Sequence, residues 1–131
     1  NALSYPASGA FDDATLMEVL DAVGLPGLGP RLHEEAHWNR TLSLGEQQRL
    51  GGARALLQAP DYLFLDEATA SLDEPSEARL YGLLHERLKG TTIVSIGHRS
   101  TLIGLHGRHV AFEPDGDAHK LSEKKPAAAA E

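Results

Sequence analysis

Two short apolar runs with a helical stretch between them constrain the fold more than any other feature of this chain. The first run is YLFL (residues 62–65), followed by Asp66-Glu67, and the second is TTIVSI (residues 91–96), followed by Gly97-His98. Short runs without polar alternation are typical of strands buried on both faces, as in a parallel sheet. Leucines recur at helical spacing between the runs, up to Gly90. This order predicts an α/β fold with a parallel sheet.

The first 58 residues are expected to be helical. Apolar residues recur at helical spacing after Asp12-Asp13, and they are Leu16, Val19, Leu20 and Val23. Gly24 is the expected stop of this helix. Residues 25–30 (LPGLGP) read as a turn, and residues 31–39 as a short helix or an irregular segment.

A capping-box pattern starts the next helix. Ser43-Leu44-Gly45-Glu46 reads S-x-x-E, in which the hydroxyl and the carboxylate can each satisfy a free backbone N–H. The helix should run to about Gln58, before Pro60. Gly51 and Gly52 inside it cost about 1 kcal/mol each relative to Ala, so the helix is expected to be closely packed or held by its neighbours.

The rest of the chain is expected to hold a short helix at residues 100–106 and an edge hairpin from His109.

Composition then excludes several classes of protein. Twelve Lys and Arg against 19 Asp and Glu give a net charge of −7, which argues against a nucleic-acid partner. The absence of cysteine excludes a disulfide scaffold, a thiolate metal site and a Cys nucleophile. No apolar run approaches the roughly 20 residues of a spanning helix.

Asp66 and Glu67 follow the first predicted strand, at the end where α/β proteins bind ligands. Successive strand residues point to opposite sides, so one carboxylate can hold Mg²⁺, usually through water, while the other activates a water. His98 is expected on the same edge, where it can hydrogen-bond a phosphate oxygen or a water. Taken alone, such an acidic pair more often starts a loop, and a single histidine is more often a surface residue.

Two further features each have a purely structural and a functional interpretation. The helix start at Ser43 and Gly45 can bind an anion, although every helix start offers such a cap. His33-Glu34-Glu35-Ala36-His37 is formally H-E-x-x-H, a zinc-binding pattern. A zinc site is disfavoured, because the residues after His37 offer no spaced third ligand.

In their order and spacing, LSLGEQQR, YLFLDEA, SLDE and a strand ending in GH resemble the carboxyl-terminal part of an ATP-binding cassette (ABC) ATPase. The family signature corresponds to residues 42–46 and the Walker B strand to residues 62–66. SYP near the start, Trp38, DEATASLDE and IGHRSTL are similar to one branch of the family. That branch comprises bacterial exporter-type transporters of the SbmA/BacA and YddA group, related to the peroxisomal fatty-acyl transporters.

The resemblance implies a partial P-loop NTPase (RecA-like) parallel sheet with an ABC α-helical subdomain. Residues 1–58 would be the helical subdomain including the signature helix, residues 59–122 the carboxyl-terminal part of the nucleotide-binding core, and residues 123–131 a low-complexity tail. The cofactors implied are ATP and Mg²⁺. Two cassettes would pair head to tail, each with a transmembrane domain on the same or a partner chain. The segment itself would be soluble and lie at the cytoplasmic face of the inner membrane.

The resemblance also implies roles for single residues. Asp66 would position Mg²⁺, Glu67 would activate water, and His98 would sense the γ-phosphate. The residues expected to contact a nucleotide or couple the two sites are Ser43, Leu44, Gly45, Glu46 and Asp73. Leu44 replaces a signature glycine and Glu46 a glutamine, and Glu46 would repel a phosphate unless it turns back to cap Ser43.

A phosphate-binding G-x-x-x-x-G-K-[ST] loop is absent from the 131 residues. That loop, the Q-loop glutamine and the aromatic residue that stacks on adenine are expected before Asn1. The chain is expected to be a piece of a longer polypeptide that, alone, neither binds ATP tightly nor hydrolyses it. Two alternatives remain open: a segment of a soluble non-transport ABC ATPase, and a truncated dimerising module without catalysis. The upstream sequence would distinguish them.

Overall fold

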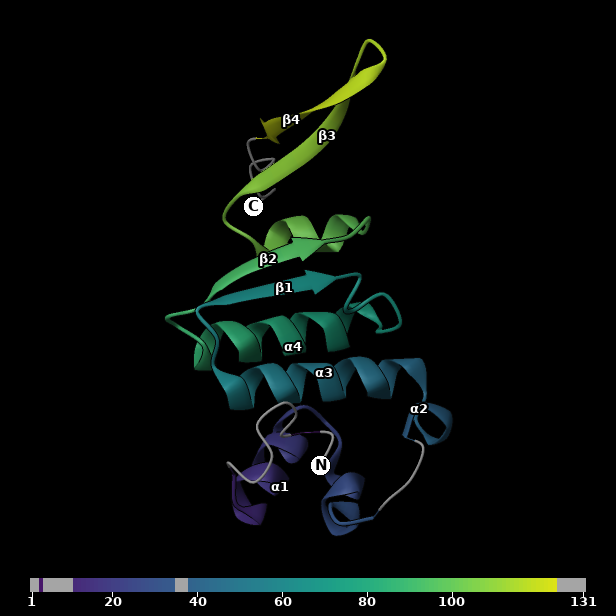
Figure 1. Cartoon of the computed structure of the whole chain (residues 1–131), viewed down its shortest axis with the longest axis vertical. Helices are drawn as coiled ribbons and strands as arrows, with labels where there is room; N and C mark the ends of the chain where they lie inside the picture. Colours follow the sequence, from purple (N-terminus) through teal and green to yellow (C-terminus); the bar gives the residue numbers. More distant parts are fainter. Residues whose placement is uncertain (1–2, 4–10, 35–37, 125–131) are drawn as a thin grey trace. The chain divides into compact units, whose positions relative to one another are not determined.

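The computed structural model describes residue 3, residues 11–34 and residues 38–124 of the chain (Figure 1). The chain divides into two compact units, Asn1–Ile96 and Gly97–Glu131. None of the helices in these described stretches is long and apolar enough to cross a membrane.

The first unit contains helices followed by a strand, a helix and a strand. In chain order these elements are α1 (Asp13–Ala22), the 3-10 helix η1 (Pro26–Arg31), α2 (Trp38–Thr41), α3 (Leu44–Gln58), β1 (Tyr62–Asp66), α4 (Glu74–Arg87) and β2 (Thr92–Ile96). Figure 1 shows α3 and α4 running along one side of the two-stranded sheet, with α1 beyond α3. The α/β class and the parallel sheet predicted from the sequence are confirmed.

Local signals define the ends of α1. The Asp12 carboxylate accepts the backbone N–H of Thr15 at 2.8 Å, which caps the first turn. At the other end Gly24 has a φ of +81°, and the N–H of Leu25 bonds the carbonyl of Leu20 at 2.8 Å. This is the left-handed glycine stop that the sequence predicts.

Helices α1, α3 and α4 enclose the core of the first unit. Its buried apolar side chains include Leu16, Val19, Leu20, Ala53, Leu57, Leu80, Leu84 and Leu88. A Cβ placed on Gly52 would lie 2.7 Å from Cδ1 of Leu80. The close packing expected around the glycine pair is therefore confirmed at Gly52, where α3 approaches α4, whereas Gly51 is exposed.

Strands β1 and β2 pair in parallel, with Tyr62 opposite Thr92 and Asp66 opposite Ile96. Leu63, Leu65 and Ile93 pack against the helical core. The prediction that both faces are buried is wrong for the residues that the structure describes. Alternate side chains are exposed on the other face, and the large apolar ones are Tyr62, Phe64, Val94 and Ile96. The physical reason is that burial on both faces needs a layer on each side, and helices α3 and α4 lie along one side only.

The second unit contains a 3-10 helix, η2 (Ser100–Leu105), and a hairpin of β3 (His109–Asp115) and β4 (Ala118–Lys124). The hairpin is a two-stranded antiparallel sheet of its own, with Gly116 in its turn at a φ of +65°. Strand β4 includes Glu123 and Lys124, which the sequence assigned to the tail, and residues 125–131 lie outside the described residues.

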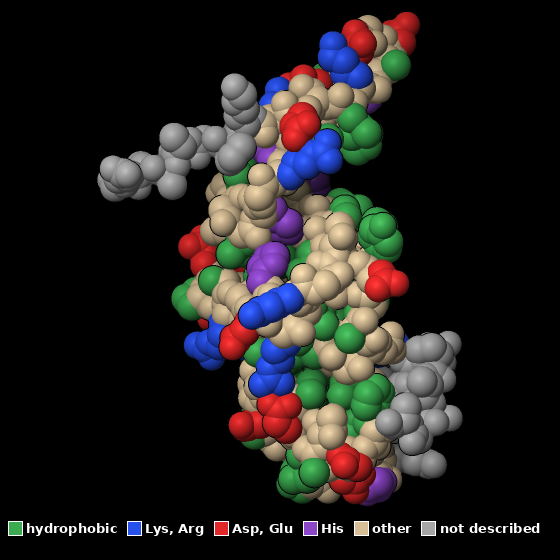
Figure 2. Space-filling view, turned by 90° about the vertical axis from the view of Figure 1, so that its left-hand side faces the viewer, with side chains coloured by type: hydrophobic (Ala, Val, Ile, Leu, Met, Phe, Trp, Pro, Cys, Tyr) green, Lys and Arg blue, Asp and Glu red, His purple; other side chains and the backbone are tan. Residues whose placement is uncertain are grey.

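Charged side chains of both signs are interspersed on the face drawn in Figure 2. Exposed ion pairs among the described residues include Arg87 with Glu18 at 2.6 Å and Arg108 with Glu123 at 2.8 Å. Each partner lowers the pKa of the glutamate that it contacts, mainly by hydrogen bonding. Exposed pairs of this kind contribute little to stability, because water screens both charges, so the apolar core dominates.

Candidate functional site

The carboxyl ends of β1 and β2 lie side by side. Asp66, the last residue of β1, pairs in register with Ile96, the last residue of β2. The backbone N–H of the next residue, Glu67, donates to the carbonyl of Ile96 at 2.9 Å. The Asp66 side chain is exposed and that of Glu67 is half-buried. The two acidic residues therefore lie at the carboxyl end of β1, at an accessible edge, as the sequence predicts.

Glu67 has an unusual backbone conformation. Its φ is +50°, in the left-handed region that residues with a side chain rarely adopt. Such a conformation costs about 1–2 kcal/mol for a residue other than glycine. The hydrogen bond to Ile96 is one of the contacts that hold it. Glu67 lies in a bend, so the backbone leaves the line of β1 at this residue.

The start of α3 is exposed and closed by both halves of a capping box. The N–H of Glu46 donates to the Ser43 hydroxyl at 3.2 Å, and the Glu46 carboxylate accepts the N–H of Ser43 at 3.0 Å. These bonds to Ser43 lower the pKa of Glu46. Glu46 thus turns back onto Ser43, the condition under which its charge is compatible with an anion at this helix start. Leu44 is 67% exposed.

Asp73 starts α4. Its carboxylate accepts the N–H of Ser76 at 2.8 Å, and this hydrogen-bonding interaction lowers the pKa of Asp73. Pro75 follows in the first turn of the helix, where proline is favoured because its missing N–H needs no partner. The exposed Asp73 side chain therefore keeps its negative charge at neutral pH.

Residues 67–72 form a loop between β1 and α4, held from two sides. Thr69 and Glu77 are 3% and 0% exposed, and the Thr69 hydroxyl donates to the Glu77 carboxylate at 2.5 Å. On the other side, the Gln48 side chain of α3 donates to the carbonyl of Glu67 at 3.3 Å and accepts the N–H of Ser71 at 2.9 Å. The sequence analysis missed Gln48, Thr69 and Glu77. Only Gln48 had a signal in the sequence: it lies three residues after Gly45 and therefore on the same face of the helix.

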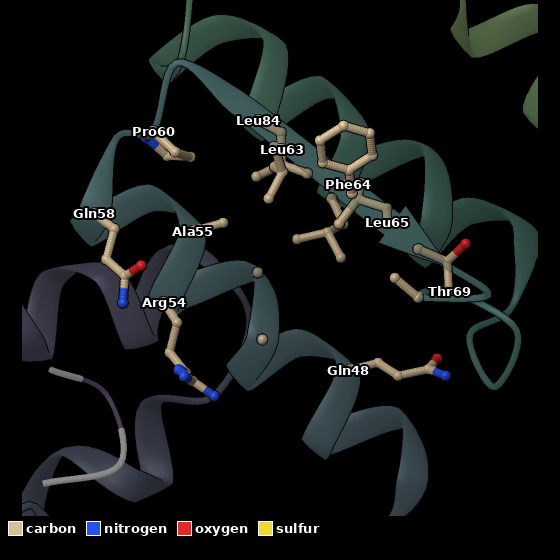
Figure 3. A pocket seen from close by; sticks show the side chains of 14 residues that line it. Gln48, Arg54, Ala55, Gln58, Pro60, Leu63, Phe64, Leu65, Thr69 and Leu84 are labelled. Atoms are coloured by element: carbon tan, nitrogen blue, oxygen red, sulfur yellow. The ribbon is translucent and has the colours of Figure 1, made fainter. Parts of the chain in front are cut away.

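A groove of about 420 Å³ lies between α3 and β1, next to this loop. Figure 3 shows Gln48 and Thr69 at one end of it and Gln58 and Pro60 at the other. Leu63, Leu65 and Leu84 line its apolar floor.

The remaining predicted site residues lie elsewhere. His98 follows the end of β2 by two residues and belongs to the second unit, so its place beside Asp66 stays a prediction. In the zinc-like pattern, Nε2 of His33 lies 2.8 Å from the Asp13 carboxylate and Glu34 pairs with Arg31 at 2.7 Å. His37, the other histidine of that pattern, falls outside the described residues.

Comparison with known proteins follows the same motifs. The family model described as "ABC transporter" matches residues 8–70. A Haemophilus influenzae protein, "Uncharacterized ABC transporter ATP-binding protein", is 46% identical over 117 residues, which are 88% of this chain and 20% of that protein. This chain belongs to the ABC transporter ATP-binding family.

Other relatives of this ABC chain fall in the branch that the motifs indicate. The "Inner membrane ABC transporter ATP-binding protein YddA" of Escherichia coli is 41% identical over 67% of the chain and 16% of that protein. The human "Lysosomal cobalamin transporter ABCD4" is 40% identical over 78% of the chain and 17% of that protein. The resemblance to the YddA group and to the related D-family transporters is therefore confirmed. The chain spans about a fifth of the length of these relatives or less.

Proposed function

We propose that this chain supplies the signature helix and the Walker B edge of a cassette that couples ATP hydrolysis to transmembrane transport. One observation carries the proposal: Asp66 and Glu67 lie at the carboxyl end of a parallel strand, held beside the end of β2 by the bond from Glu67 to Ile96. Ligands of α/β proteins bind at this edge. The relatives named as ABC transporters support the same function.

Asp66 is the proposed Mg²⁺ residue. Its exposed carboxylate offers the oxygen ligand that Mg²⁺ prefers, and Mg²⁺ sites often use only one or two carboxylates together with substrate phosphates. The donor set therefore fits the ion. Mg²⁺ supplies charge neutralisation of phosphate oxygens. Asp66 would orient that charge from the end of β1.

Glu67 is the proposed catalytic residue. It would orient an attacking water and accept its proton, while the backbone bond to Ile96 holds the residue in its left-handed conformation. His98 would contact the γ-phosphate. Catalysis of this kind depends mainly on positioning and charge stabilisation.

The signature residues act on the nucleotide of a second cassette in this proposal. The backbone N–H groups of Leu44 and Gly45 and the Ser43 hydroxyl lie at the exposed start of α3, where the helix dipole favours an anion. The capping box keeps the Glu46 carboxylate on Ser43. Asp73, at the start of α4, would couple the two sites across the dimer.

The proposed partners are a second cassette in a head-to-tail dimer and a transmembrane domain on the same or a partner chain, at the cytoplasmic face of the inner membrane. The 131-residue chain by itself is proposed to be inactive, because its sequence has no phosphate-binding G-x-x-x-x-G-K-[ST] loop. ATP hydrolysis above background by the purified chain would refute this part of the proposal.

The test of the main proposal is Glu67→Gln in the full-length protein. It should leave ATP binding intact and abolish turnover, because the amide cannot accept the proton of the attacking water. Asp61→Asn is the matched control, since Asp61 is an exposed acid directly before β1, at the opposite end of the strand. Steady-state ATPase rates and nucleotide binding are measured for both variants. Unchanged turnover in Glu67→Gln would refute the assignment.

A further inference from the structure

The side-chain amide of Gln48 bonds the loop after β1 at two points. Its nitrogen donates to the carbonyl of Glu67 at 3.3 Å, and its oxygen accepts the N–H of Ser71 at 2.9 Å. One side chain of α3 therefore bridges two backbone groups that are four residues apart in the loop. Both are peptide groups, so the contact depends on the path of the loop and not on its side chains.

A second contact joins the same helix to the same loop. A Cβ on Gly45 would lie 3.3 Å from the carbonyl oxygen of Ser71 and 3.5 Å from Cδ2 of Leu72. Gly45 and Gln48 are three residues apart and share a face of α3. The backbone of the first turn of α3 thus lies close to the loop at Gly45, and the next turn hydrogen-bonds the loop through the side-chain amide of Gln48.

The opposite side of the loop is anchored independently. Glu77 of α4 is 0% exposed and receives the Thr69 hydroxyl at 2.5 Å. Glu67 itself is bonded to β2 through the N–H that it donates to Ile96. The loop is thus held by α4 and by β2, and the side-chain amide of Gln48 links α3 to the backbone carbonyl of Glu67.

We propose that Gln48 is a positioning residue that couples the start of α3 to the backbone of Glu67. A displacement of α3, caused by an anion at Ser43, is transmitted through Gln48 to the Glu67 carbonyl and to Ser71. The inference rests on the proposed function for its consequence, but the contact can be tested without ATP. Gln48 does not touch the substrate in this scheme and acts only through Glu67 and the loop.

The structural test uses the 131-residue chain and Gln48→Met, which keeps the side-chain length and removes both hydrogen bonds. The Ser71 amide should exchange with solvent about three- to tenfold faster than in the unmodified chain, because one net hydrogen bond is lost. Gln58→Met, the same change at the last residue of α3, should leave this rate unchanged. Equal exchange rates in both variants would overturn the inference. If Gln48→Met fails to fold, the unmodified chain is used instead. The hydrogen bond from the Ser71 N–H to the Gln48 side chain should give a scalar coupling between the Ser71 nitrogen and the Gln48 Cδ carbon in NMR spectra. The absence of this coupling would also overturn the inference.

The functional test uses the full-length protein. Gln48→Met should lower kcat about three- to tenfold while the KM for ATP changes less than about twofold, since Gln48 positions the base and does not bind nucleotide. Gln48→Glu keeps the acceptor for Ser71 and should recover part of the loss. If Glu67→Gln abolishes turnover but Gln48→Met behaves like Gln58→Met, the positioning role is refuted and the proposed function stands. If Glu67→Gln leaves turnover unchanged, the proposed function itself fails.

Discussion

The backbone N–H of Glu67 donates to the carbonyl of Ile96 at 2.9 Å, so the residue after β1 is joined to the last residue of β2. Glu67 makes this bond in a left-handed conformation with a φ of +50°. The backbone of Glu67 is therefore held between two neighbouring strands, and the strain at this residue is balanced by the surrounding hydrogen bonds.

The left-handed conformation predicts an order of stability among substitutions at position 67. Glu67→Gly should be more stable than Glu67→Ala by about 1 kcal/mol, because glycine adopts a positive φ without a clash of Cβ. Urea unfolding of the two variants, followed by circular dichroism, measures the difference. An alanine variant as stable as the glycine variant would show that the backbone is not strained at this position.

The glycine pair of α3 predicts two substitutions of opposite sign. Gly52→Ala should destabilise the chain by up to about 2 kcal/mol. The new Cβ would meet Leu80 at 2.7 Å in the core, and overpacking of this kind costs about 1–3 kcal/mol, against a gain of about 1 kcal/mol in helix propensity. Gly51→Ala is the matched control and should stabilise it by about 1 kcal/mol, since nothing lies within 4 Å and alanine is the better helix former. Thermal unfolding of both variants tests the prediction, and a shift of the same sign in both would contradict it.

The buried pair of Thr69 and Glu77 predicts a cost for removing one hydroxyl. Thr69→Val keeps the shape of the side chain but removes the donor to the Glu77 carboxylate, and should destabilise the chain by about 1–3 kcal/mol. Thr92→Val makes the same change at an exposed position of β2 and should stay within about 0.5 kcal/mol. Equal unfolding midpoints for the two variants in denaturant would show that the buried bond contributes nothing.

The capping box predicts a pH dependence of stability. The bonds from Ser43 hold the pKa of Glu46 below its ordinary value. A carboxylate with a lowered folded-state pKa contributes stability above its unfolded-state pKa, and this contribution is lost as the pH falls through the folded-state value. The stability advantage over Glu46→Gln should therefore shrink as the pH is lowered from 5 to about 3. An advantage that stays constant across this range would rule out the proposed linkage.

Local features of the fold were predictable from short stretches of sequence. The caps at Asp12, Ser43 and Asp73 and the glycine stop at Gly24 depend on residues within a few positions of one another. The parallel pairing of β1 and β2 followed from two apolar runs with a helix between them. The acidic residues at the end of β1 followed from the same order, because parallel strands end at one edge.

The sequence by itself thus determined helices α1, α3 and α4, the parallel pair and the position of Asp66 and Glu67 at the end of β1. It did not predict η1 (Pro26–Arg31), which forms where the sequence indicated a turn. Tertiary structure decided which face of the strands is covered, the left-handed conformation of Glu67 and the hydrogen bond from the Gln48 side chain to the Glu67 carbonyl. The physical reason is distance along the chain. Gln48 and Glu67 are 19 residues apart, and their contact arises only when α3 packs against the loop after β1. An apolar pattern likewise indicates that strand residues prefer burial. It does not indicate which elements cover them, because that depends on how the helices pack.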